Sequence, residues 1–148
     1  MNDIILAIDP GKSGAIAIKM GDTVYTHKCP DTQTEVVELV KEYNSLAFNS
    51  DVKIKAYLEK VHAMPHEGVK SVWTFSANYA TWQTALIACK IPFEEIPPGN
   101  WMKKLGALPK ERKERKHAIK DKMQKLHPDV KVTLYNADAL AILHTMAQ

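Results

Sequence analysis

An unbroken aliphatic run at residues 4–8 ends in an acidic residue, Asp9, directly before Pro10 and Gly11. A second aliphatic run follows at 15–18. Continuous stretches of β-branched and aliphatic residues predict strands that are buried on both faces. An isolated ionised carboxylate at such a place costs several kcal/mol unless it is paired or bound to a cation. The acid at the end of the first strand therefore predicts a partner.

Two further acids stand on apolar elements in the same way. Glu59 follows the run 54–58, and Asp138 lies within the apolar segment 137–143. Three carboxylates on elements that should be buried predict a metal site. Each acid also has an ordinary explanation. Asp138 could complement a helix dipole, Asp9 could cap a turn, and Glu59 could pair with Lys60 or Lys12.

Length and composition are those of one globular domain spanning residues 1–148. No stretch approaches the roughly 18 apolar residues that cross a membrane, and Met1-Asn2-Asp3 lacks the positive start of a signal peptide. We therefore expect a cytoplasmic protein with no membrane partner. Cys29 and Cys89 form no CxxC motif, and in that compartment they are expected to be reduced.

Positive charge is concentrated in one segment. The formal net charge is +3, but residues 110–125 hold eight basic and three acidic side chains, so this segment carries +5 and the rest of the chain −2. A local positive field is typical of a surface that meets a polyanion. The alternative is a solvated helix in which Glu and Lys pair at helical spacing.

The periodicity of the chain predicts alternating strands and helices. The expected strands are 4–9, 15–20, 23–27, 54–59 and 93–96. The expected helices are one that begins at a Thr32 and Glu35 capping box and runs to about Phe48, a long one at 71–90, a turn or helix around 101–105, a basic one from Pro109 to Leu126, and 137–146 with Asn136 as its N-cap.

This order predicts an α/β fold: an antiparallel three-strand hairpin meander plus parallel strands in one mixed sheet, with helices on both faces. If the strands that end in Asp9 and Glu59 are parallel neighbours, both carboxylates leave the sheet at its carboxyl edge. Sites in α/β proteins form at that edge.

Three motifs occur in a characteristic order: Ile-Leu-Ala-Ile-Asp9-Pro-Gly-Lys-Ser-Gly, then Tyr-Leu-Glu59-Lys-Val, then Ala-Asp138-Ala-Leu-Ala-Ile-Leu. With Pro-Pro-Gly-Asn-Trp101 and the lysines behind it, the chain resembles the RuvC family of Holliday junction resolvases, most of all its phage-type members. The resemblance implies an RNase H-like fold, a homodimer, and Mg²⁺- or Mn²⁺-dependent hydrolysis of phosphodiesters in branched DNA such as four-way junctions and forks. Recombination and repair of DNA in the bacterial cytosol would follow, with phage or cellular origin left open.

The resemblance also implies roles for the acids. Asp9 would bridge two metal ions, and Glu59 and Asp138 would each bind one of them. Lys103 or Lys104 would neutralise charge on the scissile phosphate, and the sequence does not choose between them.

The family usually has a fourth carboxylate near the start of the last helix, where this chain has Leu134 or Tyr135. Three explanations stay open. Three carboxylates with water and substrate phosphate suffice, Asn136 adds a neutral ligand, or activity is weakened.

The DNA-binding residues expected from the resemblance and from the basic segment lie in four parts of the chain. They are Lys12 and Ser13, His62, His66 and Lys70, then Trp101, and finally Lys110, Arg112, Lys113, Arg115 and Lys116. His62 and His66 belong to the loop that would reach the centre of a junction, where rings stack on unpaired bases. The aromatic series Phe75, Tyr79 and Trp82 is expected in the core, with a share at a dimer interface.

The sequence gives less support to other functions. A nucleotide-binding P-loop at Gly11-Lys12-Ser13 would need glycine in place of Leu6. The ATPases with a related topology need a second domain, for which the chain has no room. The serious alternative is a protein that binds branched DNA without cutting it, and the missing fourth carboxylate is its support.

Overall fold

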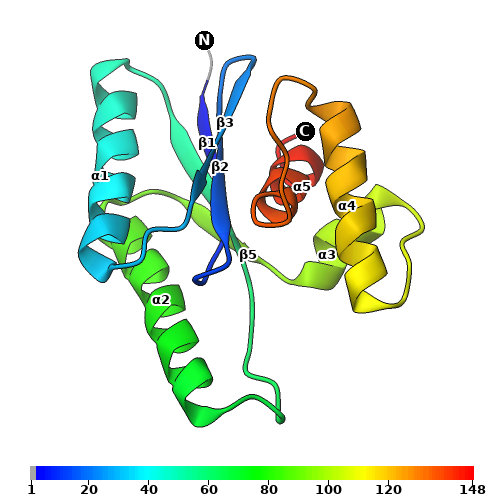
Figure 1. Ribbon diagram of the computed structural model, residues 1–148. Helices are drawn as coiled ribbons and strands as arrows, with labels where there is room; N and C mark the ends of the chain where they lie inside the picture. The colour runs from blue at the N-terminus through cyan, green and yellow to red at the C-terminus, as the bar shows by residue number, and fades with distance from the viewer. Residues whose placement is uncertain (1–2) are drawn as a thin grey trace.

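The computed structural model describes residues 3–148 as a sheet with helices on both faces (Figure 1). The strands are β1 (Ile4–Asp9), β2 (Ala15–Met20), β3 (Thr23–Lys28), β4 (Ile54–Glu59) and β5 (Phe93–Ile96). The helices are α1 (Gln33–Asn49), α2 (Val69–Ala88), α3 (Pro98–Met102), the short 3₁₀ helix η1 (Lys103–Leu105), α4 (Arg112–Leu126) and α5 (Ala137–Met146). No helix within this part of the chain has the length and apolar character to span a membrane.

The strands form one mixed sheet in the order β3-β2-β1-β4-β5. The pairs β1 with β2 and β2 with β3 are antiparallel, whereas β4 pairs in parallel with both β1 and β5. The predicted meander and parallel strands are therefore confirmed. In the parallel register Ile8 lies opposite Leu58, so that Asp9 and Glu59 are the next residues along neighbouring strands.

Side chains alternate along each strand and divide the core into two layers. Leu6 and Ile8 face α1 and α2, where Trp82 is fully buried. Ala7 faces the other way, against a layer formed mainly by α4 and α5. The two layers lie on either side of the sheet in Figure 1. Three alanines on the second face, Ala7, Ala15 and Ala17, let α5 approach the strands closely.

The first helix begins as expected, because the Thr32 hydroxyl accepts a hydrogen bond of 3.1 Å from the Glu35 amide. The basic helix begins later than predicted. Pro109 lies before it, and the Glu111 carboxylate caps it by accepting from the amides of Lys113 (3.0 Å) and Glu114 (2.8 Å). An acidic N-cap satisfies two free amides and complements the helix dipole, which proline cannot do.

The turn after β1 is closed by backbone hydrogen bonds. The Gly14 amide donates to the Gly11 carbonyl at 3.0 Å, and the Gly14 carbonyl accepts from the Cys29 amide at 3.1 Å. Gly11 has a φ of 108°, which favours glycine. A Cβ on Gly14 would lie only 1.9 Å from the backbone oxygen of Asp9. The Asp9 carbonyl thus occupies the space that the Cβ of any other residue at position 14 would need.

Gly14→Ala is expected to lower the free energy of unfolding by about 2 kcal/mol or more, because backbone atoms cannot yield to the added methyl group. Gly99→Ala is the matched control, since a Cβ there would meet no atom within 4 Å. Urea denaturation of both variants measures the difference. Equal stability of the two would contradict the close approach.

Candidate active site

The three predicted acids line one cleft of about 460 Å³, called the acidic cleft below. Asp9 comes from the end of β1, Glu59 from the end of β4, and Asp138 from the first turn of α5. The parallel register brings the first two together, and α5 packs against β1 and β2 to add the third. Residues 129 positions apart in the sequence therefore share one site.

Burial dominates the electrostatics of these acids. It is the largest cause that raises the pKa of Asp9 well above its usual value, and the negative charges of Glu59 and Asp138 raise it further. Burial likewise raises the pKa of Glu59 to about 7, and that of Asp138 above its usual value. The acids thus hold protons at a pH where exposed carboxyl groups have lost them.

Glu59 is 7% exposed and has a dedicated hydrogen-bond donor. The indole nitrogen Nε1 of Trp101, in α3, donates to Oε2 of Glu59 at 2.7 Å. Trp101 itself is fully buried. The prediction that Trp101 binds DNA is therefore wrong, because its ring packs in the layer under α5 and offers no face to a base.

The backbone around Asp9 is held by two side chains. The Cys29 thiol donates to the Asp9 carbonyl at 3.2 Å, and Oδ1 of Asn78, in α2, accepts from the Gly11 amide at 2.8 Å. Cys29 is buried and unpaired, as expected for a reduced core cysteine. Burial and the nearby charge of Asp9 raise the pKa of its thiol. This residue therefore supports the acid from the inside of the fold.

Most of the positive charge of the cleft comes from α4, and the rest comes from Lys12 in the turn after β1. Arg112, Arg115 and Lys116 line the cleft, and all three lower the pKa of Asp138. Lys116 also lowers the pKa of Asp9 and of Glu59. Lys116 is therefore the one of these cations whose field reaches all three acids.

Lys103 and Lys104, predicted to be catalytic, do not line this cleft. Both are exposed on η1, and Nζ of Lys104 lies 3.8 Å from the sulfur of Met146. Met146 ends α5, whereas Asp138 is in its first turn. At 1.5 Å per residue the two lie about 12 Å apart along the helix axis. The catalytic role predicted for these lysines is corrected. The turn formed by α3 and η1 places Lys104 near the C-terminal end of α5, whereas Asp138 is at the N-terminal end of that helix.

Six of the predicted DNA-binding residues line the acidic cleft: Lys12, Ser13, His62, Arg112, Arg115 and Lys116. Lys70 lies instead in a neighbouring hollow of about 970 Å³, called the outer groove below. His66, Lys110 and Lys113 are exposed and line neither of the two.

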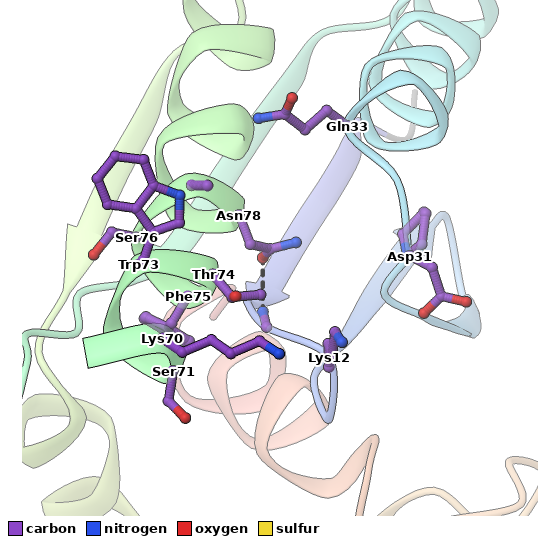
Figure 2. A pocket seen from close by; sticks show the side chains of 13 residues that line it. Lys12, Asp31, Gln33, Lys70, Ser71, Trp73, Thr74, Phe75, Ser76 and Asn78 are labelled. Carbon is purple, nitrogen blue, oxygen red and sulfur yellow. Dashed lines mark hydrogen bonds between the residues drawn. The ribbon is translucent and has the colours of Figure 1, made fainter. Parts of the chain in front are cut away.

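The outer groove runs between the turn after β1, the segment before α1 and the first half of α2 (Figure 2). Lys12 and Lys70 come from opposite walls of this groove, and the bond from Asn78 to the turn crosses its floor. Gly11, Lys12, Ser71 and Phe75 line both hollows. The outer groove is thus continuous with the acidic cleft.

No fourth acidic side chain is supplied by residues 134–136. Leu134 and Tyr135 are 43% and 56% exposed and lie outside the lining of the acidic cleft. Asn136 is buried, and its Oδ1 accepts from the Thr133 amide at 2.8 Å. Its amide nitrogen donates to Thr26 Oγ1 at 3.1 Å and to the Lys131 carbonyl at 3.0 Å.

Asn136 therefore holds the segment before α5 against strand β3. The prediction of a metal ligand at Asn136 is corrected, because its amide is engaged by these three partners away from the cleft. Asn136 is the N-cap residue of α5, as predicted, but its side chain makes no capping hydrogen bond there.

The chemistry of the three acids fits a divalent cation. Burial raises the pKa of all three acids, and a hard positive ion stabilises such groups in their charged form. Mg²⁺ commonly needs only one or two carboxylates because it keeps several waters. Within residues 3–148 no group of three His, Cys, Asp or Glu side chains is arranged to hold a metal ion. Water or substrate oxygens would therefore complete the coordination around Asp9 and Glu59.

The raised pKa of Glu59 makes the metal-free protein less stable as the pH rises. Below pH 4 the group is protonated in both states, and between about 4.5 and 7 only the unfolded state loses its proton. A shift from 4.5 to about 7 corresponds to a loss of about 3 kcal/mol above pH 7.

Urea denaturation in EDTA at pH 5 and pH 8 measures this loss, which Glu59→Gln is expected to reduce by about that amount. An equal decline in the wild type and the variant would show that other groups cause it.

Comparison with solved structures places this arrangement in a known fold. No protein-family model and no curated protein matches the sequence. A structure of Thermus thermophilus RuvC in complex with Holliday junction substrate is similar with a TM-score of 0.61 at 13% identity, over 98% of this chain and 92% of that one. A second Thermus thermophilus RuvC structure gives 0.56 at 16% identity, over 97% and 93%. The mixed sheet with helices on both faces is the RNase H-like α/β fold of RuvC.

Proposed function

We propose that the protein is a structure-selective endonuclease that resolves four-way junctions and other branched DNA by metal-dependent hydrolysis. The observation that carries this proposal is the acidic cleft, where one buried and two half-buried carboxylates, those of Glu59, Asp9 and Asp138, lie with the cations of α4 in a RuvC-like fold. A structure similar over 98% of this chain is of RuvC with a Holliday junction substrate.

In this mechanism Asp9, Glu59 and Asp138 would hold the divalent ions, Mg²⁺ or Mn²⁺ and two for each site. Bound ions of this kind activate a water molecule and stabilise the leaving oxygen. Lys116 neutralises charge on the phosphate from the opposite wall, because its field already reaches all three acids. This role replaces the one expected for Lys103 or Lys104.

The outer groove gives the DNA backbone a path away from the cleft. Lys12 and Lys70 line it from opposite walls, and it joins the acidic cleft at Gly11 (Figure 2). Basic side chains along a groove track phosphates without reading sequence. His62 lines the cleft and is the better placed of the two loop histidines to meet an unpaired base.

A protein that binds branched DNA without cutting it is the second candidate. The lack of a fourth carboxylate near the start of α5 favours it, because Tyr135 and Asn136 contribute no acid to the cleft. The fourth acid in the lining is Glu67, from the loop before α2.

Cleavage of a labelled synthetic four-way junction in Mg²⁺ and in Mn²⁺ separates the two candidates. We expect paired nicks in the junction, none in a matched duplex, and a loss of at least 100-fold in rate for Asp9→Asn, Glu59→Gln and Asp138→Asn, because each removes a charged metal ligand. Tight binding of the junction by the wild type without nicking in either metal would support the non-catalytic alternative.

The same assay tests Lys116. Lys116→Gln is expected to lower the cleavage rate by about 10- to 100-fold, whereas Lys125→Gln at the other end of α4 removes the same charge far from the cleft and should leave the rate within about twofold. Equal effects would mean that α4 contributes only a general positive field.

Paired cuts need two active sites, and α2 offers a surface for a second copy. One face of the helix is exposed and carries no charge: Val69, Trp73, Ser76, Ala80, Thr84 and Ile87. Val69, Trp73 and Ile87 are 86%, 78% and 64% exposed. Of the aromatic series Phe75, Tyr79 and Trp82, Trp82 is buried and the other two are half-buried, whereas Trp73, outside that series, is exposed. We propose that this face forms the interface of a homodimer.

Ile87→Glu is expected to convert the dimer to a monomer, because the two-fold axis would bring two new charges into an apolar contact. Phe48→Glu is the matched control, since Phe48 is 85% exposed on α1, outside that face. Sedimentation equilibrium reports the mass. A wild type that sediments as one chain at micromolar concentration would rule out the interface.

A further inference from the structure

We propose that Trp101 is a positioning residue, whose indole fixes the Glu59 carboxylate so that one chosen oxygen faces the cleft. This proposal rests on the proposed function, since it assigns Glu59 to a metal ion. Nothing in the spacing of the sequence joins these residues, which are 42 positions apart. The structure joins them by a hydrogen bond of 2.7 Å between two buried side chains.

The chemistry of the bond determines which oxygen is engaged. The indole nitrogen is a donor only, so it can partner nothing but an acceptor. It selects Oε2 of Glu59, and among the causes of the Glu59 pKa this bond is the largest that opposes burial. Oε2 is therefore engaged by the indole, and Oε1 is the oxygen that would meet the metal ion in the cleft, where Glu59 also shares a side-chain hydrogen bond with Asp9. Hydrogen bonds to a ligating carboxylate commonly fix its orientation in this way.

The fold leaves the indole little freedom. Ile96 at the end of β5 pairs with Glu59, and its carbonyl accepts from the Lys60 amide at 2.8 Å. The chain then turns through Pro97 directly into α3, which carries Trp101 into the layer under α5. The pairing of β4 with β5 thus fixes the positions of both the Glu59 carboxylate and the start of α3, the short helix that carries Trp101. A fully buried ring in this position cannot swing away from Glu59 without opening the layer.

The chain contains a matched control for the loss of this bond. Trp82 is also fully buried, but its Nε1 has no hydrogen-bond partner among residues 3–148, and it packs in the other layer of the core against α1. Trp82→Phe and Trp101→Phe remove the same atoms from equally buried sites. Only the second removes a donor from Glu59.

The indole signals of the three tryptophans provide a readout that needs no catalysis. In protein labelled with ¹⁵N at tryptophan, addition of Mg²⁺ is expected to shift the Trp101 signal and leave those of Trp73 and Trp82 in place. Assignment follows from the two Phe variants and from Trp73→Phe. A Trp101 signal that does not move while the metal binds by calorimetry would overturn the proposal.

The variants test the consequence for function. Trp101→Phe is expected to weaken Mn²⁺ binding, measured by calorimetry, by about 10- to 100-fold, and to lower kcat with KM for the junction unchanged. Trp82→Phe should change neither quantity by more than about twofold, although both variants lose packing. Equal metal binding in the two variants would leave Trp101 as a core residue only and overturn the proposal.

Failure of the proposed function has a different signature. A wild type that never cuts a junction, yet shows the Trp101 shift with Mg²⁺ and a weakened Trp101→Phe, would reject the nuclease and keep the positioning role. The opposite result is a wild type that cuts the junction and a Trp101→Phe variant that cuts and binds Mn²⁺ as well as Trp82→Phe does. That result would keep the nuclease and reject the positioning role of Trp101.

Discussion

The parallel pairing of β1 with β4 is the constraint on which the rest of the site depends. It sets Asp9 beside Glu59 at the edge where both strands end, and the two charges then have to be accommodated next to each other and partly out of water. The neighbouring groups reduce the free-energy cost of burying these two charges. Trp101 donates a hydrogen bond to Glu59, and α4 supplies nearby cations. The pKa values stay raised because these partners offset only part of the cost of burial.

The site combines a rigid inner side with a charged, accessible outer side. Trp101 and Cys29 reach Glu59 and the Asp9 carbonyl from within the core, where packing holds each side chain in one place, and Asn78 holds the turn after β1 from the outer groove. Lys116 approaches from an exposed helix turn. Such an arrangement combines carboxylates that are preorganised with a cation that keeps its side-chain freedom.

Much of the candidate site could be predicted because burial leaves a signature in sequence. Asp9, Glu59 and Asp138 interrupt apolar elements, and the order of those elements allows only a few sheet topologies. The errors have a common cause. Trp101, Lys103 and Lys104 were assigned from their position next to one another, but a short helix turns the tryptophan into the core and the lysines out to solvent. Asn136 was assigned from proximity to Asp138, whereas its amide bonds to a strand 110 positions away.

The sequence by itself determined which strands and helices would form, that their apolar faces would be buried, and that three acids would need a partner. These follow from periodicity and from the cost of burying charge, both of which are local properties of the chain. Only the tertiary structure decided which donor meets Glu59, which cation faces all three acids, and which oxygen is left for the cleft. Those contacts join residues far apart in the chain, and their geometry depends on how the strands pair and how the helices pack over them.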